Sequence, residues 1–87
     1  MNYPIDTPAQ ARAVLRALRH GRGLSQAQVG QLLGVSQKRV ARIESAPDRT
    51  SFDQIAKLVA ILGGRVVIED TAGSSTPKKQ KTGRAGW

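Results

Sequence analysis

Two short helical patterns meet across a tight turn in residues 24–44, LSQAQVGQLLGVSQKRVARIE. The first pattern begins with a capping box at residues 25–28, SQAQ, where a serine caps the first turn and a glutamine three residues later bonds back to it. Gly34 is placed to end this helix in a left-handed conformation. Ser36, two residues later, is a candidate cap for the next helix. The spacing therefore predicts two helices joined by a sharp turn.

The two predicted helices differ in their outward faces. In the first, Val29, Leu32 and Leu33 are expected to face inward, and in the second the inward pair is Val40 and Ile43. A glycine in the middle of the first helix, at position 30, costs about 1 kcal/mol of helix propensity, which fits a place where another helix crosses closely. Two short helices around a tight turn, the second with a polar outward face, have the layout of a helix-turn-helix.

The polar face of the second helix has the chemistry needed to read base pairs in the major groove. Lysine and arginine donate to guanine O6 and N7, and glutamine pairs with adenine N6 and N7. Ala41 is small enough to allow close approach or contact with a thymine methyl group. A solvated helix face is the alternative interpretation. The predicted DNA-binding residues are Gln26, Ser36, Gln37, Lys38, Arg39, Ala41 and Arg42.

Two further capping boxes frame this motif, at residues 7–10, TPAQ, and residues 51–54, SFDQ. They predict a helix over about 8–20 and another that begins after Ser51 and ends at the glycine pair 63–64. Both segments carry apolar side chains at helical spacing. The expected fold class is all-α, with four or five short helices, a C-terminal strand and a tail.

The strand is predicted at residues 65–69, RVVIE, because β-branched side chains favour extended chain. A lone strand leaves its backbone donors and acceptors unpaired. We therefore expect it to pair with its own copy in a homodimer through Val66, Val67 and Ile68, a frayed extended segment being the alternative. Residues 1–70 would then form a DNA-binding and dimerisation domain.

Residues 71–87 are predicted to be a flexible basic tail. They consist mostly of Gly, Ser, Thr, Pro, Lys and Gln, and their four basic residues are not offset by any acid. Such a composition buries too little apolar surface to fold alone. Trp87 ends the tail, and its indole is a candidate anchor in a partner's pocket, the alternative being a tolerated terminal residue.

Composition narrows the function classes. The chain has 87 residues and a formal charge of +8, which indicates a polyanionic partner, either nucleic acid or an anionic membrane surface. With no cysteine, a single histidine and no paired carboxylates, no enzyme activity, metal site or cofactor is expected. Neither an apolar run of about 20 residues nor a signal peptide is present, so we expect no membrane partner and a cytoplasmic, nucleoid-associated bacterial protein.

Residues 24–26, 33–37 and 43–44 resemble the helix-turn-helix of the lambda-repressor-like (XRE) regulators. The resemblance covers about residues 7–64. It implies that Gln26 holds a phosphate at a helix N-terminus, where free N–H groups attract anions, and that Gln37, Lys38 and Arg42 read bases. It also implies a structural ion pair between Arg19 and Glu44, expected to be partly exposed and worth about 1 kcal/mol or less. Weaker phosphate candidates are Arg12, Arg16 and Arg22.

A narrower resemblance begins at residues 43–51, IESAPDRTS, and continues through the predicted helix, strand, polar tail and terminal tryptophan. This layout is similar to that of the HipB antitoxins. The resemblance implies a dimeric autorepressor that binds a palindromic operator and holds a HipA-type Ser/Thr kinase toxin. Two alternatives remain open: a stand-alone phage or plasmid repressor without a toxin, and a protein-interaction inhibitor whose basic surface fits an acidic partner.

Overall fold

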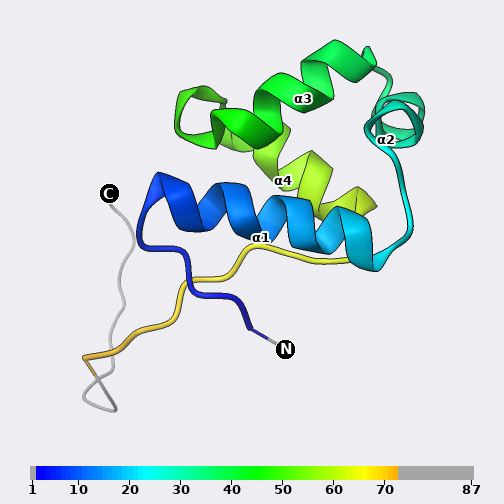
Figure 1. Ribbon diagram of the computed structural model, residues 1–87. Helices are drawn as coiled ribbons and strands as arrows, with labels where there is room; N and C mark the ends of the chain where they lie inside the picture. The colour runs from blue at the N-terminus through cyan, green and yellow to red at the C-terminus, as the bar shows by residue number, and fades with distance from the viewer. Residues whose placement is uncertain (1, 73–87) are drawn as a thin grey trace.

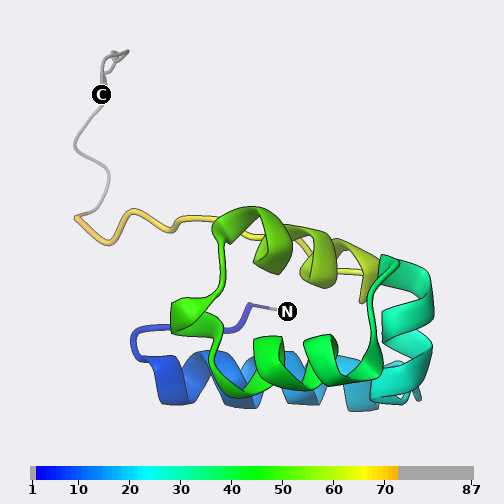
Figure 2. The same ribbon diagram turned by 90° about the horizontal axis from the view of Figure 1, so that it is seen from above.

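The computed structural model describes residues 2–72. It contains four α-helices and one 3-10 helix: α1 (Pro8–Gly21), α2 (Gln26–Leu33), α3 (Gln37–Ser45), η1 (Pro47–Arg49) and α4 (Phe52–Ile61). Figure 1 shows α3 above α1, and Figure 2 shows α4 on the far side of this pair, with α2 closing one end. The prediction of an all-α helix-turn-helix domain with four short helices is confirmed. None of the described helices is long and apolar enough to cross a membrane.

Local capping sets where the helices begin. Ser25 Oγ accepts from the Gln28 backbone N–H at 3.1 Å, and Gln28 Oε1 accepts from the Ser25 N–H at 2.8 Å. Thr7 and Gln10 form the same reciprocal box at the start of α1. The box predicted at residues 51–54 is only half formed: Ser51 caps the Gln54 N–H at 3.2 Å. The Gln54 side chain instead accepts from an arginine of α3, a contact that the local pattern does not contain.

The core is built from the predicted apolar stripes. Its buried members come from all four α-helices and the end of α4: Leu15, Val29, Val40, Ile43, Leu58, Val59 and Leu62. One prediction for α2 is wrong, because the side chain of Leu32 is 61% exposed. Val29 and Leu33 are one turn apart and share the packed face, whereas Leu32 lies about 100° from Leu33 around the helix. So short a helix buries only one narrow stripe.

Gly30 lies where the chain crosses itself between α2 and α3. A Cβ at this position would be 2.7 Å from the carbonyl oxygen of Val35 and 3.2 Å from the carbonyl carbon of Ser36. The Gly30 carbonyl accepts from the N–H groups of Gly34 and Val35 at 2.8 and 2.9 Å, and Gly34 has φ +81°. The turn thus packs against α2 so closely that only glycine fits.

Replacing Gly30 with alanine is expected to carry a steric cost of about 1–3 kcal/mol, because the methyl group meets backbone atoms rather than a side chain that could rotate away. The gain in helix propensity, about 1 kcal/mol, offsets only part of this cost, so a net destabilisation of up to about 2 kcal/mol is expected. Urea denaturation followed by circular dichroism measures the change. Gly21→Ala is the matched control, because a Cβ there has no neighbour within 4 Å; equal stability of the two variants would contradict the steric argument.

The chain after α4 is extended. Gly63 turns it with φ +85°, and Arg22 Nε donates to the carbonyl oxygen of Leu62 at 2.8 Å, capping the end of the helix. Residues 65–70 then run past the helices without a β-ladder to any part of residues 2–72. The predicted strand therefore has no partner within residues 2–72, and the intermolecular sheet stays a prediction. Trp87 and the basic residues of the predicted tail lie outside the described residues.

Candidate nucleic-acid interface

A buried ion pair joins α1 to α3. Arg19 Nε donates to Glu44 Oε2 at 2.6 Å, and a second guanidinium nitrogen, Nη2, donates to Glu44 Oε1 at 3.2 Å. The remaining nitrogen, Nη1, donates to the Leu24 carbonyl oxygen at 3.0 Å. The two side chains are 10% and 2% exposed. The expectation of a partly exposed pair is wrong, because both side chains are buried between the packed helices and their charges are removed from water.

Two glutamines extend this ion pair to the surface. Gln26 Nε2, at the start of α2, donates to Glu44 Oε1 at 3.2 Å. Gln37 Nε2, at the start of α3, donates to Gln26 Oε1 at 2.9 Å. The chain of bonds runs from α1 through α3 and α2 and back to α3, and we call it the Arg19–Gln37 network. It orients the Gln37 amide and leaves its oxygen outside the network, able to accept a bond from a ligand.

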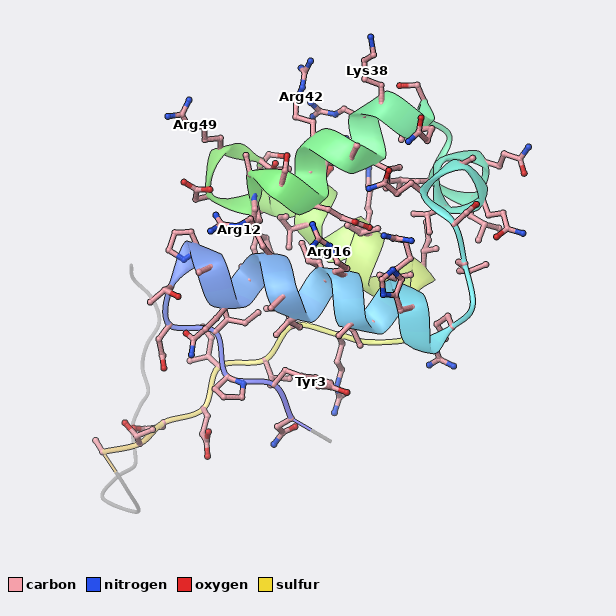
Figure 3. The ribbon with its side chains drawn as sticks, viewed as in Figure 1. Tyr3, Arg12, Arg16, Lys38, Arg42 and Arg49 are labelled. Atoms are coloured by element: carbon pink, nitrogen blue, oxygen red, sulfur yellow. The ribbon has the colours of Figure 1, made fainter. Side chains whose placement is uncertain are left out.

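The outward face of α3 carries two cations. Lys38 and Arg42 are exposed, and Figure 3 shows both side chains projecting from α3 away from α1. Within residues 2–72 the salt bridges are Arg19–Glu44 and Lys57–Asp53, so neither cation has a carboxylate partner there. Ala41, on the same helix, is half-buried. The arrangement leaves two free positive side chains, one turn apart, on the helix that the sequence assigns to base reading.

Two other residues that the sequence predicts at the DNA, Ser36 and Arg39, form hydrogen bonds within the protein. The Ser36 hydroxyl accepts from the Arg39 backbone N–H at 3.0 Å and caps α3. The Arg39 guanidinium turns toward α4, where its Nε and Nη2 donate to Gln54 Oε1 at 3.3 and 3.1 Å. Arg39 therefore ties α3 to α4 in this conformation. Arg22, a weaker phosphate candidate, likewise donates to a backbone carbonyl oxygen, that of Leu62 at the end of α4.

An open cleft of about 610 Å³ lies where α1 ends and α2 and α3 begin. It exposes the first turn of α2, whose free N–H groups and positive dipole end favour an anion. Arg16 and His20 of α1 line it, and the Arg16 guanidinium adds a cation to the positive dipole end of α2. Its lining residues are Arg16, Arg19, His20, Ser25, Gln26, Ala27 and Gln37.

Sequence reasoning missed two residues of this surface. His20 lines the cleft, and Arg49 projects from η1 on the side of the molecule where Arg42 and Lys38 project (Figure 3). In the sequence, the one signal for Arg49 was its position in the turn that follows α3. Its direction depends on how η1 packs against α1 and α3, which local sequence does not encode.

Comparison with known proteins shows which family this chain belongs to and which solved structure its fold resembles. A family model described as a helix-turn-helix domain matches residues 10–66, more than half of the chain. No curated protein sequence matches. Among solved structures, the chain is similar to a serine-to-alanine variant of HipB in the "O2 20mer complex", with a TM-score of 0.73 and 22% identity over 82% of this chain and 99% of that chain. The resemblance to HipB thus holds for the fold. The chain belongs to the helix-turn-helix family of DNA-binding domains.

Proposed function

We propose that this protein is a transcriptional repressor that binds a palindromic operator as a homodimer. The observation that carries the proposal is the outward face of α3. Lys38 and Arg42 project from it without carboxylate partners, and Gln37 beside them is oriented by the Arg19–Gln37 network. These side chains supply the donors and acceptors that distinguish base pairs in the major groove. The protein acts by binding alone, on the nucleoid in the bacterial cytoplasm.

Each part of the surface has its own task in this proposal. Lys38 and Arg42 donate to guanine, Gln37 pairs with adenine, and Ala41 allows close approach to a thymine methyl group. The start of α2, with Gln26 at the cleft, holds a backbone phosphate and sets the register. Arg19 and Glu44 do not touch DNA; they hold Gln26 and Gln37 in position.

Selection of preferred duplexes from a random library tests the repressor proposal. The selected sequences should be palindromic, with half-sites one helical turn or a multiple of it apart. They should bind at least about 10³-fold more tightly than mixed-sequence DNA at physiological salt. Equal affinity for selected and random duplexes would exclude sequence-specific repression and favour an inhibitor that binds acidic protein surfaces.

Lys38→Ala and Arg42→Ala are each expected to cost about 1–3 kcal/mol of binding free energy on the selected duplex, and less on mixed-sequence DNA, because a base contact is lost. Fluorescence anisotropy titrations measure both affinities. Lys57→Ala is the control, because the ammonium group of Lys57 pairs with Asp53 on α4 at 3.1 Å. If the loss is the same on both duplexes, the mutated residue contacts phosphate and the base-reading role is wrong.

The proposed dimer uses the extended segment after α4. Val66, Val67 and Ile68 are 46%, 59% and 96% exposed, so three adjacent β-branched side chains face water in the single chain. Pairing with a twofold-related copy would satisfy the open backbone edge and cover these side chains.

Val67→Pro is expected to yield monomer or a weak dimer and to lower operator affinity with it, because proline removes a ladder donor. Sedimentation equilibrium measures the association constant. Val67→Thr serves as the control, since it keeps the β-branched shape and the backbone N–H. An unchanged dimer in the proline variant would place the interface elsewhere, with α4 as the next candidate.

We further propose that the repressor is the antitoxin of a HipA-type Ser/Thr kinase. Support comes from the HipB fold and from the sequence layout beyond residue 43, which ends in a basic tail and Trp87. Titration of a purified HipA-type kinase with the full-length chain and with Trp87→Ala tests it, and a clear loss of affinity in the variant is expected. Absence of binding by the full-length chain would leave a stand-alone repressor; identical affinities of the two chains would discard the tryptophan anchor.

A further inference from the structure

We infer that Arg22 determines which half-site spacing the dimer accepts, because its side chain fixes the joint between the DNA-binding helices and the segment proposed to dimerise. The joint is the glycine pair Gly63–Gly64, which connects α4 to residues 65–70. The inference rests on the proposed binding of an operator by a homodimer, and deepens it by naming a residue that sets operator specificity. Arg22 is a positioning residue: it acts through the chain that it holds.

The joint lies where the chain leaves the packed helices. Gly63 has φ +85°, and the backbone N–H groups of Gly63 and Gly64 donate to the carbonyl oxygens of Ala60 and Val59 at 3.0 and 2.9 Å. Every residue from 65 to 70 is exposed. Glycine has the widest choice of backbone conformations, so two adjacent glycines do not by themselves fix the direction in which the exposed segment leaves α4.

Arg22 reaches this joint from the turn after α1. Its Nε donates to the Leu62 carbonyl oxygen at 2.8 Å, in a partly buried bond between residues 40 positions apart in the sequence. The guanidinium also lies against Gly63, because a Cβ on Gly63 would be 2.7 Å from Arg22 Cζ and closer still to Nη2. The guanidinium therefore occupies the space that a side chain at position 63 would fill.

The backbone of Arg22 is bonded to the part of the domain that holds the recognition helix. Its N–H donates to the carbonyl oxygens of Leu18 and Arg19 at 3.2 and 3.1 Å. The Arg19 side chain is in turn bonded to Glu44 of α3. One continuous set of contacts thus leads from α3 through the end of α1 to Leu62. Removal of the Arg22 side chain interrupts this set at the joint and leaves α3 itself unchanged.

A fixed joint makes a dimer selective for one distance between half-sites. Each base pair added between the half-sites moves them apart by about 3.4 Å and rotates one relative to the other by about 34–36°. Two linked binding units gain from each other only when both can engage at once, and the gain is lost when the geometry forbids this. A dimer with two fixed joints should therefore reject neighbouring spacings, whereas free joints should accept them.

A spacing series tests the inference. The protein and Arg22→Ala are titrated by fluorescence anisotropy with the selected palindrome and with versions that carry one or two additional base pairs between the half-sites. The wild type should lose at least about tenfold in affinity when the spacing changes, and Arg22→Ala less than about threefold. Arg22→Lys keeps an N–H donor and should recover part of the discrimination. Sedimentation equilibrium should give the same dimer association constant for all three proteins, because residues 66–68 are unchanged.

A matched pair of glycine variants tests the same contact from its other side. Gly63→Asn places a Cβ where the Arg22 guanidinium lies, and asparagine tolerates positive φ better than most residues. It should show the relaxed spacing profile of Arg22→Ala. Gly23→Asn is the control, since Gly23 also has positive φ, +67°, but a Cβ there has no neighbour within 4 Å. The double variant Arg22→Ala, Gly63→Asn should be no more relaxed than either single variant, because both remove one contact.

The outcomes separate this inference from the proposed function. If Arg22→Ala is less stable to urea but keeps the wild-type spacing profile, Arg22 only caps α4 and the inference is wrong, while the repressor proposal stands. If it weakens selected and mixed-sequence duplexes equally and lowers the slope of log K against log salt, Arg22 contacts phosphate and the positioning role is wrong. A wild-type protein without any spacing preference overturns both the homodimeric operator binding and the inference.

Discussion

Replacing Glu44 with alanine is expected to lower the free energy of unfolding by about 3–5 kcal/mol. The substitution leaves the Arg19 guanidinium buried, with the Leu24 carbonyl as its one remaining bonding partner. A fold of about 70 residues has a total stability of about 4–10 kcal/mol, so the substitution should remove a third or more of it. The loss is large because desolvation of the arginine is no longer offset by an opposite charge.

Urea denaturation of the variant and of Asp53→Ala measures the difference. Asp53 forms an exposed ion pair with Lys57, in which the lysine side chain is 62% exposed and the aspartate side chain 73% exposed. Loss of this pair should cost less than about 1 kcal/mol of unfolding free energy. The double variant Arg19→Met, Glu44→Leu should recover much of the stability, because an apolar pair needs no desolvation. Its DNA affinity should nevertheless be lower than that of the wild type, because the Gln26 amide loses its acceptor, the Glu44 carboxylate. Equal losses in Glu44→Ala and Asp53→Ala would contradict the buried-pair argument.

Operator affinity is expected to fall by about 10³–10⁵ between roughly 50 and 200 mM salt, if the dimer neutralises about six to ten phosphates. The described residues supply enough unpaired cations for this on the proposed DNA face: Arg12, Arg16, Lys38, Arg42 and Arg49. Their release of condensed counterions from DNA makes the free energy of binding depend on the logarithm of salt concentration.

Anisotropy titrations of the selected duplex at several salt concentrations measure this slope. The same series with Lys38→Ala separates the two kinds of contact, because a lost base contact shifts the line and a lost phosphate contact changes its slope. A fall of less than tenfold over the range would mean that few phosphates are contacted. The wide basic surface would then serve an acidic protein partner instead.

The helices themselves follow from local sequence. The reciprocal capping boxes at Thr7 and Ser25 set two helix starts, and the spacing of Leu15, Val40 and Leu58 predicts which faces are buried. These features involve residues within a turn or two of each other, so no knowledge of the tertiary structure is needed. Even the place of Gly30 at a close crossing is predictable, because its cost in helix propensity has no other local explanation.

The site depended on contacts between distant parts of the chain. Arg19 and Glu44 are 25 residues apart, and the resemblance suggested their pairing but not its burial. Arg39 was expected at the DNA and binds α4, and the direction of Arg49 is set by the packing of η1. A long side chain can reach several partners, and which one it binds depends on the desolvation and geometry that the packed helices impose. For that reason the sequence alone determined the helices and predicted a recognition face, while only the tertiary structure decided which cations of that face lack a carboxylate partner within residues 2–72.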